Sequence, residues 1–214
     1  MPAHCRTGVK ICGLTEAAGF DACVEHGADW IGFVFFNRSP RFVKPQQVAG
    51  LVGRGLGHAR AVGLFVHPSD EDIARVLEHA PLDVLQIYAS DARAQQVAQT
   101  FALPVWLSFP VAGREDLPAK CPVQRMLIEP RPPKDATRPG GNAQKLDWSM
   151  LAGWKPPFPW MLAGGLGVES VAEAIRITGA PAVDVSSGVE SAPGIKDPAL
   201  IARFVRNART TGEV

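Results

Sequence analysis

Residues 182–190 read Ala182-Val183-Asp184-Val185-Ser186-Ser187-Gly188-Val189-Glu190, a short apolar run that ends in two serines and a glycine. A short, nearly continuous apolar run is typical of a strand that is buried on both faces in a parallel sheet. The serines and the glycine that follow favour a tight loop. Similar runs alternate with helix-like stretches along the whole chain, which predicts an α/β fold.

Eight such runs can be counted, at residues 9–12, 30–36, 61–66, 84–89, 104–109, 125–129, 159–163 and 182–185. Helix-start signals lie between them, at Thr15, at Ser69 with Asp72 three residues on, at Ser90, and at Asp197 before Pro198. This count predicts a compact (β/α)8, or TIM, barrel. The alternative is a doubly wound open sheet, which has the same local pattern. The barrel is favoured because no Gly-x-Gly-x-x-Gly follows the first run.

Length and charge bound the organisation of the chain and its partners. The 214 residues are enough to bury one full core, and we expect a single domain over residues 1–214, with residues 1–8 as a short tail. With 22 basic and 21 acidic residues, the formal net charge is +1. Proteins that bind nucleic acid or membranes usually carry a one-sided charge. We therefore expect a small-molecule partner, with no nucleic acid and no membrane.

Cysteine and histidine usage gives no sign of a metal site. The four cysteines form no Cys-x-x-Cys pair and the five histidines are scattered, so neither a metal centre nor a disulfide framework is predicted. No signal-type apolar stretch follows the first residues, and no run of about eighteen apolar residues occurs. The expected location is the reducing cytoplasm.

Two glycine-rich loops are candidates for a phosphate site. Barrels often bind phosphate through backbone N–H groups after strands seven and eight. Here the seventh run is followed by Gly164 and Gly165, and the eighth by Ser186, Ser187 and Gly188. Either loop alone is compatible with an ordinary tight turn. Their joint occurrence at the two expected places predicts a phosphate site.

Five motifs, in order along nearly the whole chain, carry a family resemblance. They are Lys10-Ile11-Cys12-Gly13-Leu14-Thr15; Gly27-Ala28-Asp29-Trp30-Ile31-Gly32-Phe33 running on to Ser39-Pro40-Arg41; Asp147-Trp148; Ala163-Gly164-Gly165-Leu166; and Asp184-Val185-Ser186-Ser187-Gly188-Val189-Glu190. With these motifs the chain resembles the phosphoribosylanthranilate isomerases of tryptophan biosynthesis. The resemblance implies a cofactor-free and metal-free Amadori rearrangement of a small phosphoribosyl substrate, by one general acid and one general base.

The resemblance also assigns roles to single residues. It makes Cys12 the catalytic base, which requires a site that favours a thiolate. Lys10, which alternates with Cys12 along the strand, either assists it or points elsewhere. Arg41 matches the arginine near the anthranilate part of the substrate, where a guanidinium suits a carboxylate; without the motif it would be a solvated surface arginine. Substrate binding is further expected from a set that matches the family motifs: Gly164, Gly165, Asp184, Ser186, Ser187 and Gly188.

The sixth strand departs from the family pattern. The family has an aspartate as its general acid at the end of this strand, and here Glu129 stands in that place. Glutamate keeps the acid but moves it by one methylene, and a displacement near 1 Å can cost about 10²-fold where geometry is demanding. We predict that Glu129 is the catalytic acid. The alternative is a strand-end carboxylate that is paired with Arg131 or Arg138.

Two further departures lie near the predicted mouth. The family usually has Gln-Leu-His-Gly at the fourth strand, where this chain has Gln86-Ile87-Tyr88-Ala89; Tyr88 either narrows the cavity or stacks on an aromatic ligand, or is a rim residue. Residues 130–146 form a long loop, in which Ala143 replaces a common glycine, and we predict a lid that orders with ligand.

These departures leave two other functions open. One is a low-activity or non-catalytic paralogue that binds a phosphoribosyl ligand, and the other is an isomerase of a different aminoaldose phosphate. Cys12 argues against the second, because the related histidine-pathway barrel usually has aspartate at that position. The chain is expected to be a monomer or a homodimer.

Overall fold

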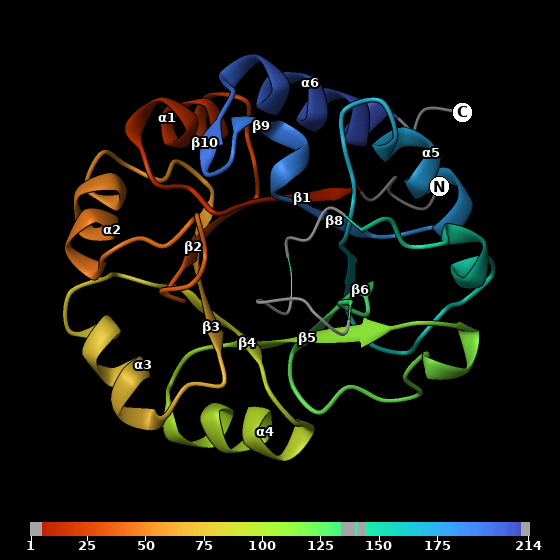
Figure 1. Cartoon of the computed structure of the whole chain (residues 1–214), viewed down its shortest axis with the longest axis horizontal. Coiled ribbons are helices and arrows are strands. Elements are labelled where there is room, and N and C mark those ends of the chain that lie inside the picture. Colours follow the sequence, from red (N-terminus) through yellow and green to blue (C-terminus); the bar gives the residue numbers. More distant parts are fainter. Residues whose placement is uncertain (1–5, 134–139, 141–143, 211–214) are drawn as a thin grey trace.

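Eight parallel strands close into a barrel in this computed structural model, which describes residues 6–133, 140 and 144–210. Each strand pairs with the next, and β8 pairs with β1 (Figure 1). The strands are β1 (Gly8–Cys12), β2 (Trp30–Val34), β3 (Arg60–Val66), β4 (Val84–Tyr88), β5 (Val105–Val111), β6 (Arg125–Pro130), β7 (Trp160–Leu162) and β8 (Ala182–Val185). The predicted barrel is confirmed and the open sheet is wrong. All eight apolar runs are strands, with ends that differ from the prediction by a residue or two.

Six α-helices among the described residues surround the strands (Figure 1). They are α1 (Ala17–Glu25), α2 (Pro45–Val52), α3 (Asp70–Leu77), α4 (Asp91–Thr100), α5 (Val171–Thr178) and α6 (Pro198–Arg209). After β5 and β6 the described chain forms only short 3₁₀ turns, η1 (Arg114–Asp116) and η2 (Trp148–Leu151). Between β8 and α6 lie η3 (Ser187–Val189) and a hairpin of β9 (Glu190–Ala192) and β10 (Ile195–Lys196).

Three of the four predicted helix starts are confirmed by a side-chain oxygen that accepts a backbone N–H at the start of α3, α4 and α6: Ser69, Ser90 and Asp197. The fourth prediction is wrong by one residue, because α1 follows Glu16, whose carboxylate caps the helix. The Thr15 hydroxyl instead donates to the Gly194 carbonyl at 3.0 Å. Thr15 thus ties the end of β1 to the β9–β10 hairpin.

The barrel interior changes from apolar to polar along the strands. One cluster of apolar side chains fills the first part, formed by Val62, Val84, Trp106, Leu127, Met161 and Ala182. Two residues further along β4, β5 and β6 stand the buried polar residues Gln86, Ser108 and Glu129. Side chains two apart on a strand lie on the same face. The polar layer therefore sits above the apolar plug, toward the carboxyl ends of the strands.

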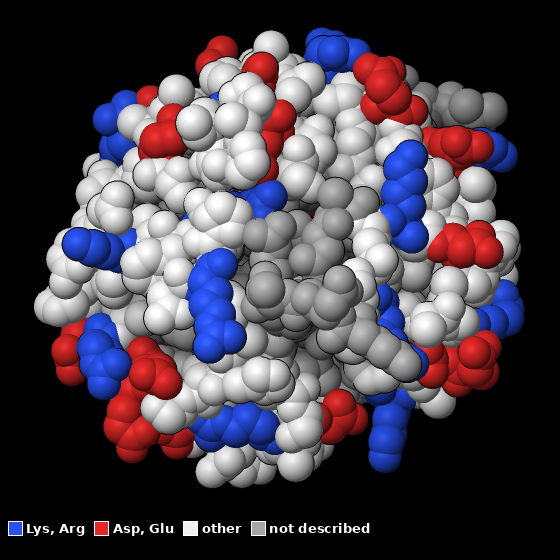
Figure 2. Space-filling view, in the orientation of Figure 1, with Lys and Arg blue, Asp and Glu red and all other residues white. Residues whose placement is uncertain are grey.

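Charged side chains of both signs are interspersed around the face of the molecule in Figure 2, and neither sign forms a continuous field among the described residues on that face. None of the helices within the described ranges has both the length and the apolar character needed to cross a membrane.

Candidate active site

A cavity of about 880 Å³, which includes open solvent at its mouth, lies at the carboxyl ends of the barrel strands. This is the end at which TIM barrels carry their active sites. The cavity is lined by eight of the nine residues predicted for the site: Cys12, Arg41, Glu129, Gly164, Gly165, Asp184, Ser186 and Ser187. Gly188 is not among the lining residues, but it packs closely against Leu166, which is one of them.

Cys12 ends β1 inside the barrel, with only 4% of its surface exposed. Burial raises the pKa of its thiol, while the neighbouring Lys10 ammonium opposes this shift by charge and by hydrogen bonding. Lys10 is fully buried and its Nζ donates to Asp184 Oδ1 at 2.8 Å. Burial alone would lower the pKa of Lys10, but the charges of Asp184 and Cys12 outweigh it and raise that pKa. Lys10 thus lies beside Cys12 with its ammonium group paired to Asp184, and its assistance to Cys12 stays a prediction.

Glu129 enters the same cavity from β6 and is 6% exposed. Its Oε2 accepts a hydrogen bond from the Tyr88 hydroxyl at 3.0 Å, whereas its buried Oε1 has no partner among the described residues. Burial raises the pKa of Glu129 to about 8, against the opposing effect of the Tyr88 hydrogen bond. The predicted alternative pairing with Arg131 is wrong, because Arg131 binds Asp116 at 3.0 Å, and Arg138 lies outside the described residues.

Tyr88 lines the cavity from the end of β4. Burial raises the pKa of its phenol well above the usual value, so the hydroxyl is a hydrogen-bond donor at neutral pH. Because this hydroxyl points to Glu129, Tyr88 belongs to the cavity wall and is not an amphipathic rim residue.

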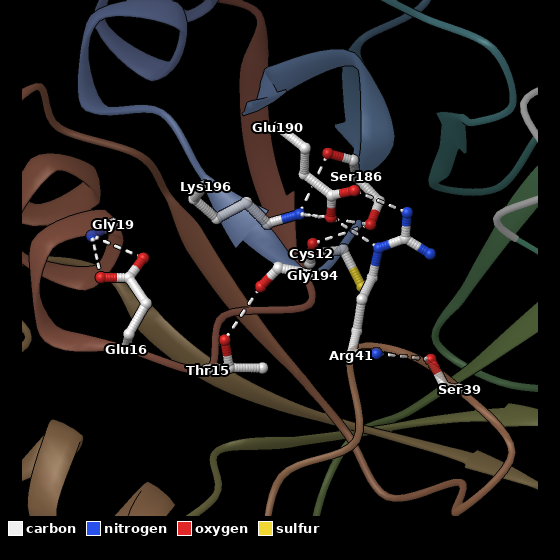
Figure 3. A network of polar contacts seen from close by, with 10 residues as sticks. All are labelled: Cys12, Thr15, Glu16, Gly19, Ser39, Arg41, Ser186, Glu190, Gly194 and Lys196. Carbon is white, nitrogen blue, oxygen red and sulfur yellow. Dashed lines mark hydrogen bonds and ion pairs between the residues drawn. The ribbon is translucent and has the colours of Figure 1, made fainter. Parts of the chain in front are cut away.

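Arg41 belongs to a buried charge network that the sequence did not predict (Figure 3). Its Nε and Nη2 donate to the two carboxylate oxygens of Glu190 at 2.6 and 2.8 Å, and Lys196 Nζ donates to Glu190 Oε1 at 2.7 Å. Arg41 is 5% exposed, so the alternative of a solvated surface arginine is wrong. These two cations hold the pKa of Glu190 below its usual range although burial opposes the shift. One carboxylate between two cations leaves net positive charge beside the cavity.

Glu190 ends one of the motifs, whereas no periodicity or spacing in the sequence singles out Lys196. A lysine on a two-residue strand is expected to be exposed, yet the Lys196 side chain is completely buried. Lys196 Nζ also donates to the Ser186 carbonyl at 3.0 Å, and the Ser186 hydroxyl donates to the Cys12 carbonyl at 3.0 Å. The network in Figure 3 therefore fixes the loop after β8 to the end of β1.

The glycines of the two candidate phosphate loops are required by close backbone contacts. Gly164 and Gly165 have positive φ angles of 93° and 66°. A Cβ on Gly188 would lie 2.0 Å from the carbonyl oxygen of Leu166, which follows the β7 glycines. Real Cβ atoms do not approach backbone so closely, so these loops pack against each other through glycine.

The predicted lid, residues 130–146, is only partly within the described residues. Residues 131–133 and 144–146 carry neither helix nor strand, and Ala143 and the lid motion predicted with it lie outside the described part. Gly140 is described and lines the cavity. In the described ranges, no three His, Cys, Asp or Glu side chains gather into a cluster that could hold a metal ion.

Comparison with known proteins gives a consistent result. Residues 9–207 match the model of the family described as N-(5'phosphoribosyl)anthranilate (PRA) isomerase. The N-(5'-phosphoribosyl)anthranilate isomerase of Granulibacter bethesdensis is 51% identical over 205 residues, which cover 94% of this chain and 98% of that protein.

Solved structures agree with the sequence relatives. Phosphoribosyl anthranilate isomerase from Thermotoga maritima superposes with a TM-score of 0.83 at 30% identity, covering 95% of this chain and 99% of that chain. A structure of phosphoribosyl anthranilate isomerase in complex with reduced 1-(o-carboxyphenylamino)-1-deoxyribulose 5-phosphate has a TM-score of 0.80 at 29% identity, with coverage of 95% and 99%.

Proposed function

The chain belongs to the N-(5'-phosphoribosyl)anthranilate isomerase family, and from this premise we propose that Glu129 is its general acid and Cys12 its general base. The enzyme is an aldose-ketose isomerase that converts N-(5-phosphoribosyl)anthranilate into 1-(2-carboxyphenylamino)-1-deoxyribulose 5-phosphate in tryptophan biosynthesis. One observation carries the assignment: a thiol from β1 and a carboxyl group from the non-adjacent β6 line a single cavity.

The two groups suit the two proton transfers of an Amadori rearrangement. Glu129 gives its proton to the furanose ring oxygen as the C1–O bond breaks, and the anilino nitrogen lone pair forms the C=N bond. The Cys12 thiolate then removes the proton from the second sugar carbon, and the C–H electron pair neutralises the iminium to give an enolamine. Protonation at the first carbon and loss of the enol proton yield the ketose. A catalyst of each kind typically contributes about 10²- to 10⁴-fold.

In the reactive protonation state the two groups carry one proton in total: Glu129 is a carboxylic acid and Cys12 is a thiolate. Burial raises both pKa values, that of Glu129 to about 8, so both groups carry protons at pH 7. Loss of one proton from the pair gives two tautomers, of which the carboxylate with a thiol predominates because the pKa of Cys12 is raised above its ordinary value. The carboxylic acid with a thiolate is the reactive tautomer, and loss of the second proton abolishes it. Lys10 and Lys196 favour the thiolate by their charge.

The charge network suits the carboxylate of the anthranilate ring. Arg41 uses Nε and Nη2 for Glu190, and its Nη1 has no hydrogen-bond partner within the described residues. A guanidinium fixed in this way presents its remaining donors without further loss of side-chain freedom. We assign the substrate carboxylate to Arg41, and sugar hydroxyls to Asp184, which lines the cavity with a carboxylate that accepts hydrogen bonds.

The phosphate is assigned to the loops after β7 and β8. Gly164, Gly165, Ser186 and Ser187 line the cavity there, and Gly188 allows the two loops to pack closely. Glycine backbone and a serine hydroxyl offer N–H and O–H donors to an anion. The Ser186 hydroxyl is already engaged by Cys12, so this residue contributes through its backbone.

Gly188→Ala is expected to raise KM about tenfold with a smaller effect on kcat, because the added methyl forces the β8 loop away from Leu166 and misplaces the phosphate donors. The measurement is steady-state kinetics with inorganic phosphate as a competitive probe, whose inhibition constant should rise in parallel. Gly50→Ala in α2 is the matched control, since a Cβ there meets nothing within 4 Å. An unchanged KM for Gly188→Ala would contradict the phosphate assignment.

The proposed function is tested by turnover of phosphoribosylanthranilate by the purified protein, and by rescue of a tryptophan-requiring strain that lacks this isomerase. We expect kcat/KM to rise as pH increases through about 8, where the first proton leaves the pair, and to fall at still higher pH, where the second proton leaves. Calorimetric binding of the product without any turnover would instead identify a non-catalytic paralogue.

Two properties of the protein outside the site are also part of the proposal. We place the enzyme in the cytoplasm, where the reducing environment keeps the Cys12 thiol available for proton transfer. We expect a monomer or a homodimer, which light scattering at micromolar concentration distinguishes.

A further inference from the structure

The only tyrosine of the chain contacts the proposed acid. Tyr88 ends β4, Glu129 lies at the end of β6, and both project into the barrel interior across β5, which stands between them in the sheet. The Tyr88 hydroxyl and Glu129 Oε2 are 3.0 Å apart. These are two of the positions at which the sequence departs from the family motifs, and the fold brings them into direct contact.

The hydrogen bond makes the two oxygens of Glu129 unequal. Oε2 accepts from Tyr88, whereas Oε1 is buried and has no partner among the described residues. A structural carboxylate would avoid an unpartnered buried oxygen, because such an oxygen loses its hydrogen bonds to water without replacement. If Oε2 is the acceptor, the acidic proton is carried by Oε1. Oε1 is therefore the oxygen of this cavity-lining carboxyl group that no other described residue occupies.

A glutamate needs such a restraint more than an aspartate does. Its extra methylene adds a rotatable bond, so fixing the longer side chain costs more conformational entropy. A proton donor that is misplaced by about 1 Å can lose about 10²-fold in rate. A fixed hydroxyl on a neighbouring wall removes this freedom before substrate binds.

The surroundings hold Tyr88 itself in place. Gln86 Nε2 donates to Ser108 Oγ at 2.9 Å in the layer below. On the cavity side, a Cβ on Gly140 would lie 2.2 Å from the Tyr88 hydroxyl oxygen. The Gly140 backbone therefore covers the Tyr88–Glu129 contact closely.

We propose that Tyr88 is the positioning residue of the acid: its hydroxyl holds Glu129 Oε2 so that Oε1 presents the proton to the ring oxygen of the substrate. The inference rests on the proposed function of Glu129. It explains how a longer acid works in this barrel, and it makes Tyr88 and Glu129 one functional unit. Tyr88 acts through Glu129 and does not transfer a proton itself.

A double-mutant cycle tests the proposal, with kcat and KM measured against pH for the full-length enzyme, Tyr88→Phe, Glu129→Asp and the double variant. We expect Tyr88→Phe to lower kcat by about 10- to 100-fold with KM nearly unchanged. In the Glu129→Asp background, where the shorter carboxyl group does not reach Tyr88, the same change should cost less than about threefold. The Tyr88 hydrogen bond lowers the pKa of Glu129 in the unmodified enzyme. Tyr88→Phe should therefore raise this pKa and move the pH limb near 8 upward.

Controls separate this proposal from loss of fold and from failure of the proposed function. Thr100→Val deletes an exposed hydroxyl of α4, hydrogen bonded to the Gln96 carbonyl, and should leave kcat and the pH profile unchanged. Thermal unfolding of Tyr88→Phe reports the fold. Additive effects in the cycle, an unshifted pH limb, or a raised KM with normal kcat would overturn the role of Tyr88 while Glu129 remains the acid. An active Glu129→Gln variant would instead overturn the proposed function.

Discussion

Cys12→Ser is expected to lower kcat by about 10³-fold, because a serine hydroxyl does not ionise near neutral pH and so supplies no base for the proton on the second sugar carbon. The replacement is nearly isosteric and Cys12 is buried at the end of β1, so the barrel should remain intact. Lys10 and Asp184 keep their own ion pair. KM should therefore change little, since the phosphate and carboxylate contacts are separate from the thiol.

The comparison that checks this prediction is steady-state turnover of phosphoribosylanthranilate alongside Cys121→Ser. Cys121 is a partly buried free thiol before β6 that donates to the Val123 carbonyl and is not among the cavity-lining residues. The Cys121→Ser variant should keep full activity, which would show that the loss in Cys12→Ser comes from the missing base and not from replacing any thiol by a hydroxyl. Activity of Cys12→Ser within tenfold of the unmodified enzyme would rule out Cys12 as the base.

Glu129→Gln should lower kcat by about 10³-fold, since the amide keeps the shape of the side chain but has no acidic proton for the ring oxygen. It should also remove the pH limb near 8, because that limb belongs to a carboxyl group whose pKa is raised by burial. Gln at this position can still accept from the Tyr88 hydroxyl, so the packing of the site is retained.

Kinetics across pH 6–10 check this second prediction, with Glu115→Gln as the control. Glu115 is an exposed carboxylate of η1 outside the cavity and should be dispensable. Retention of both high kcat and the limb near 8 in Glu129→Gln would show that another group donates the proton. Retention of the limb alone would assign it to a different residue.

Local sequence patterns were enough to predict the barrel. The apolar run before Cys12 places it at the end of a strand, and the glycines near 164 and 188 mark the loops after β7 and β8. Such features depend on neighbours along the chain, through side-chain alternation and the φ angles that glycine allows. The helix start at Thr15 failed for a tertiary reason, since its hydroxyl bonds to Gly194, 179 residues away.

The motifs predicted many of the residues that line the site, but they did not predict the contacts that these residues make. Arg41 was expected near the substrate carboxylate, but no motif predicted that Glu190, 149 residues further along the chain, holds its guanidinium. Lys196, which completes that network, was missed because a lysine on a short hairpin strand has no sequence signal for burial. The network exists only because the β9–β10 hairpin folds against the loop after β2.

The sequence by itself determined the order and spacing of the strands, the end of the barrel that carries the site, and the residue types that reach it. Only the tertiary structure decided the proton affinities and contacts, such as the bond between Tyr88 and Glu129 across 41 residues and that between Lys10 and Asp184 across 174. The reason is physical: strand formation responds to short-range periodicity, whereas desolvation and ion pairing depend on distances that are fixed when the barrel closes.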